Sequence, residues 1–228
     1  MTPARHPRHR VYAVLFALIG LCLGYFAVGG GVSALLFGWL GLCFVIMGWA
    51  YAVGEPRIFG KNADGSLSFF RVFLLLPYVA VVGLVWHAQR RFSREAPFHL
   101  VDRGLYLGSW PRENDCPNDV DLVVDLTAEL PRDARGTFEY WLVPTLDGCS
   151  PTIEKLTELA ERIAKHPGAV YLHCAAGHGR SATVAAAVMV LRGTKPTVED
   201  AIAHLHATRP GVRVNAVQRA VLDAWSHR

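Results

Sequence analysis

Charge is missing from a long stretch near the start of the chain. No Asp, Glu, Lys or Arg occurs between Arg10 and Glu55, although charged residues make up 18% of the 228-residue sequence. Such a run is too long for one core helix of a water-soluble domain, whereas two membrane crossings of about 20 residues each would fill it. The sequence therefore predicts spans at about 11–28 and 32–53, joined by a turn at Gly29–Gly31.

A secretory signal peptide is the alternative explanation for the first span. Basic residues precede it, and Val32–Ala34 resembles a weak cleavage site. A second full-length apolar run follows at once, which favours a hairpin. A third apolar stretch at about 69–87 is short for a crossing and contains Pro77, so we expect an interfacial or re-entrant helix there. Residues 1–90 are thus predicted to form a membrane anchor.

The basic residues around these segments predict the orientation of the anchor. They lie at Arg5, Arg8 and Arg10, in the loop 57–61, and in the cluster 90–94. Cytoplasmic flanks of membrane helices are enriched in Lys and Arg, so all three sites are expected on the cytoplasmic side. A domain at about 96–228 would then also face the cytoplasm.

Several classes of function lack their usual patterns. No basic stripe interleaved with aromatic residues occurs in the second half, so we expect no nucleic-acid partner. The five cysteines include no CxxC pair and no regular spacing, which indicates reduced thiols rather than a disulfide framework. No Gly-Lys-[Ser/Thr] ending marks a nucleotide-binding loop. The sequence does not predict an oligomeric state.

The second half of the chain alternates short apolar runs with amphipathic ones. This alternation predicts an α/β fold, a mainly parallel sheet flanked by helices. Ligands of such sheets bind at the carboxyl ends of the strands, and Cys174 lies there, between a strand and a helix. The expected strands are 120–126, 140–144 and 169–174, and the expected helices are 151–166, 182–193, 197–208 and 215–228.

The segment HCAAGHGRSA, residues 173–182, carries the clearest chemistry. A loop of small residues before a helix can turn its backbone N–H groups toward an anion, and the helix dipole favours negative charge there. The same field, with Arg180 nearby, lowers the pKa of a cysteine and activates Cys174 as a nucleophile. Arg180 can hold two phosphate oxygens at once, and Ser181 can donate a hydrogen bond to the sulfur. The expected phosphate-binding residues are Ala175, Ala176, Gly177, His178, Gly179 and Arg180.

Two other roles for Cys174 are weaker. A metal site would use it with His173 or His178, but no second cluster of ligands at suitable spacing accompanies them. A buried structural cysteine would leave Arg180 and the small-residue loop without a purpose. We therefore expect no metal and no cofactor.

Cleavage of a phosphate ester also needs a proton donor for the departing oxygen. Asp147, in the sequence PTLDGCSPT, lies between a predicted strand and a predicted helix, on a connection that could move over the phosphate. A turn or helix cap is an equally good explanation for a single loop aspartate. Asp125 is the rival acid, although its position at a strand end suits a structural hydrogen bond.

The pattern Cys-x5-Arg-Ser, with His173 before it and glycine within it, resembles the phosphate loop of the dual-specificity group of cysteine-dependent phosphatases. GLYLGSWP, VVDLTAE and RPGVRVN extend the similarity over about 98–228. The resemblance implies that Cys174 is the nucleophile, Asp147 the general acid, and His173 a residue that orients the loop.

The sequence is similar to a bacterial membrane-attached branch of this family, related to the mitochondrial phosphatidylglycerophosphate phosphatase. That similarity implies a lipid phosphate substrate at a bacterial inner membrane. Ala175 and His178 stand where relatives acting on phosphoinositides tend to carry lysine, which weakens an inositol-lipid assignment. Phosphotyrosine, phosphoserine or phosphothreonine proteins remain the alternative substrates, and a non-catalytic phosphate-binding module is the alternative class.

Overall fold

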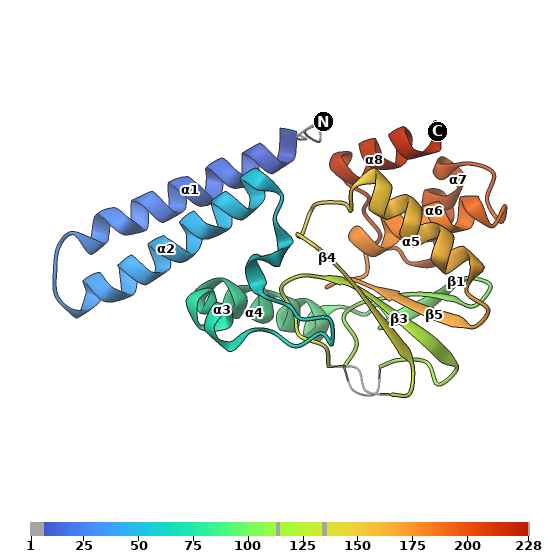
Figure 1. Cartoon of the computed structure of the whole chain (residues 1–228), viewed down its shortest axis with the longest axis horizontal. Helices are drawn as coiled ribbons and strands as arrows, with labels where there is room; N and C mark the ends of the chain where they lie inside the picture. Colours follow the sequence, from blue (N-terminus) through green and yellow to red (C-terminus); the bar gives the residue numbers. More distant parts are fainter. Residues whose placement is uncertain (1–6, 113–114, 134–135, 228) are drawn as a thin grey trace.

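The structure, a computed structural model, describes residues 7–112, 115–133 and 136–227 (Figure 1). Arg5, one of the basic residues before the first apolar run, lies outside these residues. A helical hairpin projects from an α/β domain, and two further helices connect them (Figure 1).

The hairpin consists of α1 (Pro7–Ala27) and α2 (Val32–Val53). Both are long and apolar enough to cross a membrane by length and composition. Their backbones pack closely: a Cβ on Gly20 would lie 2.8 Å from the carbonyl oxygen of Gly41, so only glycine fits there. The first helix begins and the second ends beside the α/β domain, while the turn lies at the far end (Figure 1).

The third apolar stretch forms two helices where we expected one at 69–87. These are α3 (Phe69–Leu74) and α4 (Leu76–Phe92), which follow a short 3-10 helix, η1 (Pro56–Phe59). Pro77 explains the break, because proline has no N–H for a helical hydrogen bond and its ring collides with the preceding turn. Proline is tolerated in a first turn, and Pro77 occupies that position in α4.

A five-stranded sheet forms the centre of the second half, in the order β1-β2-β5-β3-β4. The strands are β1 (Phe98–Asp102), β2 (Leu105–Gly108), β3 (Val120–Thr127), β4 (Glu139–Thr145) and β5 (Ala169–His173). The pairs β2–β5, β5–β3 and β3–β4 are parallel, and only β1–β2 is antiparallel. The α/β fold with a mainly parallel sheet is thus confirmed, whereas the edge strand β1 and its neighbour β2 were not predicted.

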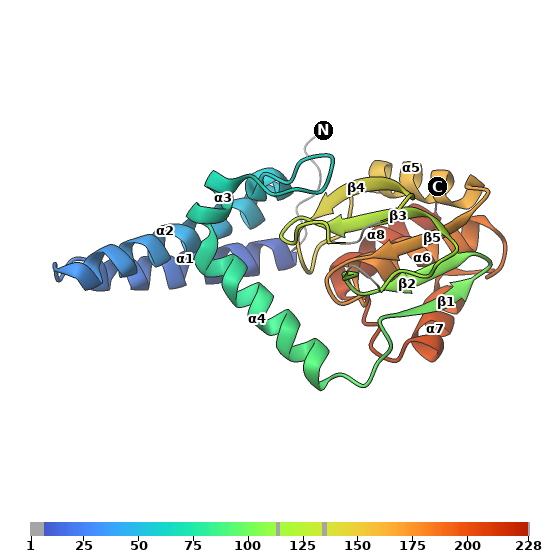
Figure 2. The same ribbon diagram turned by 90° about the horizontal axis from the view of Figure 1, so that it is seen from below.

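Four helices lie on one side of the sheet (Figures 1 and 2). Leu122, Val124 and Leu126 of β3 point toward them into the main core. The alternate β3 residues Val123 and Asp125 are equally buried on the other face. The helices are α5 (Ile153–Lys165), α6 (Arg180–Leu191), α7 (Val198–Thr208) and α8 (Ala216–Ser226).

Candidate active site

The loop between β5 and α6 holds its carbonyl oxygens on its outer side. Ala175 O accepts hydrogen bonds from Trp110 N at 3.0 Å and from Trp86 Nε1 at 2.9 Å. Arg209 donates to Ala176 O and Gly177 O at 3.0 and 3.2 Å. In a trans peptide the next N–H points opposite to the carbonyl, so the N–H groups turn inward. Gly177 N accordingly donates to Cys174 Sγ at 3.3 Å.

Gly177 is required by this loop on two grounds. Its φ of +77° is left-handed, and a Cβ there would collide with the backbone of Gly108 on strand β2. The predicted phosphate-binding residues 175–180 therefore form one curved loop whose backbone N–H groups point inward. Whether they bind phosphate remains a prediction.

Two buried cysteines near this loop differ in the direction of their pKa shift. Burial raises the pKa of the Cys149 thiol to about 12. Burial also opposes ionisation of Cys174, but Arg180 and the hydrogen bond with Ser181 Oγ, 3.3 Å from the sulfur, lower its pKa below the ordinary value. Cys174 is thus the thiol prepared to act as a thiolate.

Arg180 begins α6 and is 1% exposed. Glu129 accepts a bidentate pair of hydrogen bonds from it, to Nη1 at 3.0 Å and Nη2 at 2.7 Å. Nη2 also lies 3.2 Å from Asp147 Oδ1. Burial opposes the charge, but Glu129 and Asp147 raise the pKa of Arg180. Among the described residues, Arg180 Nε is buried without a hydrogen-bond partner, so one donor of the guanidinium is unused.

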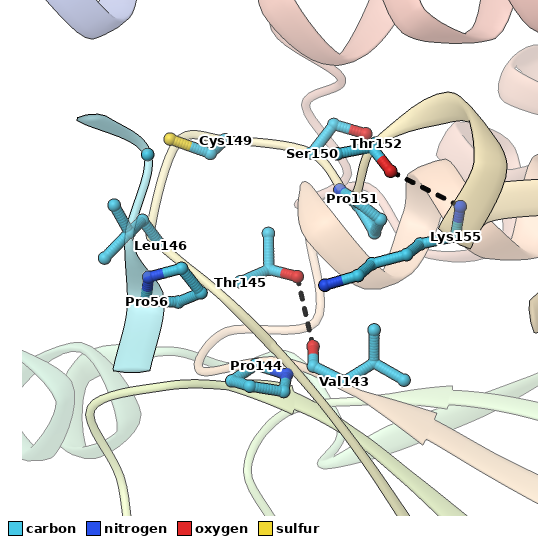
Figure 3. Close-up of a pocket in the computed structure, with 11 residues that line it drawn as sticks. Pro56, Val143, Pro144, Thr145, Leu146, Cys149, Ser150, Pro151, Thr152 and Lys155 are labelled. Atoms are coloured by element: carbon cyan, nitrogen blue, oxygen red, sulfur yellow. Dashed lines mark hydrogen bonds between the residues drawn. The ribbon is translucent and has the colours of Figure 1, made fainter. Parts of the chain in front are cut away.

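Asp147 lies on the connection from β4 to α5, and its side chain is 70% exposed. Tyr51, near the end of α2, donates a hydrogen bond to Asp147 O at 3.1 Å, a contact that the sequence did not predict. Asn215 donates to Gly148 O at 2.9 Å from the other side. Beside this contact, a small cavity of about 80 Å³ lies between Gly54, Pro56 and residues 143–155 (Figure 3). The candidate acid is thus positioned by backbone contacts that leave its carboxylate exposed.

Cys174, Arg180 and Asp147 line one cavity of about 350 Å³. Helix α4 forms a wall of it, and Arg213, Asn215 and Gln218 lie on the C-terminal segment that also lines it. Among the described residues, no group of three His, Cys, Asp or Glu side chains could hold a metal ion. The arrangement suits nucleophilic attack by sulfur on an anion held by Arg180 and the loop amides.

Comparison with known proteins identifies this arrangement. Residues 105–228, more than half of the chain, match the family model for the dual specificity phosphatase catalytic domain. The chain belongs to the dual-specificity phosphatase family. As a member, it is a cysteine-dependent phosphatase, a phosphoric monoester hydrolase.

Relatives of this phosphatase agree on the fold. Phosphatidylglycerophosphate phosphatase PTPMT2 of Arabidopsis thaliana is 28% identical over 153 residues, which cover 60% of this chain and 67% of the relative. The active form of Tk-PTP is 26% identical with a TM-score of 0.51, covering 58% of this chain and 97% of that structure. PTPMT1 is 24% identical with a TM-score of 0.51, covering 57% and 94%.

The rival acid, Asp125, lies outside the cavity lining of the phosphatase. It is buried on β3 beside its register partner, His173, whose Nε2 lies 3.8 Å from Asp125 Oδ1. Lys61 Nζ donates to Asp125 Oδ2 at 2.6 Å and to Thr127 Oγ1 at 2.8 Å. Burial lowers the pKa of His173, although the neighbouring Asp125 carboxylate opposes that shift. Asp125 and Lys61 thus support His173, the residue directly before the candidate nucleophile Cys174. This position suits the predicted role of His173 in orienting the loop.

Four residues of the site were missed by sequence reasoning: Glu129, Arg209, Lys61 and Trp86. Each acts through a contact between segments distant in the chain. Glu129 lies inside the segment VVDLTAE, and Arg209 inside RPGVRVN, so the quoted similarity contained both without assigning them a role. Lys61 and Trp86 lie within residues 1–90, where only charge and hydropathy were considered.

Proposed function

We propose that this protein is a membrane-anchored phosphatase that removes the terminal phosphate from a lipid phosphate monoester such as phosphatidylglycerophosphate. The observation that carries the chemistry is that Cys174, whose pKa is lowered, and the guanidinium-bearing Arg180 line the same cavity. The lipid assignment rests on the anchor helices and on the name of the Arabidopsis relative.

The reaction proceeds in two displacements. The Cys174 thiolate attacks phosphorus, an S–P bond forms, and the P–O bond to the lipid breaks while Asp147 gives its proton to the leaving oxygen. Water then attacks phosphorus and gives a proton to the Asp147 carboxylate, and the S–P bond breaks to release phosphate and the thiolate. Arg180 and the loop amides hold the equatorial oxygens in both steps. The Ser181 hydroxyl stabilises the sulfur as it leaves.

The orientation of the anchor is supported by the contact of Lys61 with β3. Because the loop after α2 touches the catalytic domain, the two lie on the same side of a membrane. A single crossing by α4 between them is incompatible with that contact, and α3, with six residues, is too short to supply a second crossing. Their exposed Phe69, Phe70 and Leu84 suit an interfacial position instead. Together with the basic flanks, this contact supports the proposal that the catalytic domain lies at the cytoplasmic face of a bacterial inner membrane.

The decisive experiment compares initial rates of the full-length protein on phosphatidylglycerophosphate in mixed micelles and on phosphotyrosine peptides. We expect faster turnover of the lipid, inhibition by vanadate and no effect of chelators. Cys174→Ser is the matched control and should abolish turnover while still binding vanadate. A preference for the peptide would assign a protein phosphatase, and no hydrolysis of any phosphate ester would indicate a binding module.

A further inference from the structure

The wall that α4 contributes to the active-site cavity is apolar. Tyr78, Val81, Val82, Val85 and Trp86 all line it together with the catalytic residues. Their spacing is three, four, seven and eight residues from Tyr78, so they form one face of the helix. None of them carries a charge, and Gln89 is the one further α4 side chain in the lining.

This wall is fixed to the catalytic loop rather than loosely apposed to it. Trp86 is 5% exposed, its Nε1 donates to Ala175 O, and its ring packs edge-on against Trp110 with centroids 4.8 Å apart. One turn further along α4, Arg90 Nη2 lies 2.6 Å from Asp115 Oδ2. The distance between wall and nucleophile is therefore set by direct contacts.

The wall also continues to the outer surface of α4. Val81 is 54% exposed and Val85 is 48% exposed, so the apolar lining extends from the cavity to its open rim. Leu84, on a different side of the helix and outside the lining, is 71% exposed. A lipid with its phosphate at Cys174 can thus extend along the valine side chains toward the outer surface of α4, the side proposed to lie at the membrane interface.

We propose that Val81, Val82 and Val85 form a specificity subsite for the glycerol and first acyl carbons of a lipid phosphate. This inference rests on the proposed function and names the residues that select its substrate class. Apolar chains gain by leaving water for this wall. A peptide would instead place backbone N–H and C=O groups against the valine side chains, which offer no hydrogen bond. Trp86 Nε1 is already used by Ala175.

The test uses substrates that are monomeric in solution, so that membrane partition does not contribute. The full-length protein in detergent is given glycerol 3-phosphate, dibutyryl and dihexanoyl phosphatidic acid below their micellar concentrations, and p-nitrophenyl phosphate as the reference. For the unmodified protein, kcat/KM relative to the reference should rise with chain length. Val82→Asn and Val85→Asn should each reduce this ratio for the dihexanoyl lipid about tenfold.

Leu84→Asn is the matched control, because it makes the same kind of change on the same helix outside the cavity. It should keep the full dependence on chain length, and Val82→Ile should keep it too. An unchanged ratio in the valine variants, or an equal loss in Leu84→Asn, would overturn the subsite. Hydrolysis of p-nitrophenyl phosphate and phosphotyrosine peptide but of no lipid by the unmodified protein would instead overturn the proposed function itself.

Discussion

Replacing Lys61 with methionine tests how strongly the anchor loop is built into the catalytic domain. Met keeps the length and volume of the side chain but removes the ammonium from a pair whose two side chains are each 1% exposed. Loss of one partner from a buried pair costs about 3–5 kcal/mol. Asp125 keeps hydrogen bonds from Thr127 and Tyr140, which favours the lower end. We therefore expect a loss of about 3 kcal/mol in the free energy of unfolding.

The assay is thermal unfolding of the full-length protein in detergent, followed by tryptophan fluorescence. For a chain of this size, about 3 kcal/mol corresponds to a fall of roughly 6–12 °C in Tm. Lys165→Met, a change at an exposed position at the end of α5, is the control and should shift Tm by about 2 °C or less. Lys61→Met with Asp125→Asn should recover at least about 1 kcal/mol relative to Lys61→Met alone, because no unpaired carboxylate is then buried.

Acid provides a second measurement on the same pair. Burial alone would raise the pKa of Asp125, but His173, Lys61 and the Tyr140 hydroxyl lower it to about 2. When the pKa of a carboxyl is lower in the folded state, its ionised form stabilises the fold at every pH above the unfolded pKa of about 3.9. For Asp125 this contribution is about 2 kcal/mol, and it is lost as the pH falls from 4 to 2. The Tm difference between the unmodified protein and Lys61→Met should thus shrink below pH 4. Equal Tm values at pH 7 would refute the reasoning.

Three further predictions concern catalysis. Asp147→Asn should slow the hydrolysis of alkyl phosphates far more than that of p-nitrophenyl phosphate, whose leaving group needs little protonation. It should also flatten the basic limb of the kcat profile against pH, and an unchanged limb would exclude Asp147 as the acid. Tyr51→Phe removes one hydrogen bond to the Asp147 backbone and should lower kcat for alkyl phosphates about threefold to tenfold, with the aryl rate as the internal control. Arg209→Met removes the hydrogen bonds to two loop carbonyls and should raise the inhibition constant of vanadate at least about tenfold. An unchanged constant would show that the loop keeps its shape without Arg209.

The elements predicted from sequence are those with strong local patterns. Strand β3 and helix α7 lie within one residue of the expected ranges, since an apolar run and the Thr197 cap define them without reference to other segments. Strands β1 and β2 were not predicted because they are five and four residues long and mix polar with apolar side chains. Their identity depends on pairing with each other and with β5, which no local pattern shows.

The candidate site divides in the same way. Cys174 and Arg180 belong to one loop and the first turn of one helix, so ten consecutive residues were enough to find them. Glu129 and Arg180 are 51 positions apart, and Lys61 and Asp125 are 64 apart. Lys61 in particular was taken as a topological charge at the membrane, whereas its ammonium is buried against β3. Sequence reasoning assigned it a side of the membrane but had no means to find its partner.

The contacts between residues 1–90 and the catalytic domain reach the backbone beside each candidate reacting group. Trp86 binds the carbonyl after Cys174, Tyr51 binds the carbonyl of Asp147, and Lys61 binds the carboxylate that faces His173. A tether that only raised the local substrate concentration would need none of these, because a flexible linker achieves the same enrichment. Leaving Asp125 buried without Lys61 would be costly, so the resting geometry of the site depends on the anchor being in place. The cavity is consequently held in a fixed orientation relative to α4, which forms one of its walls.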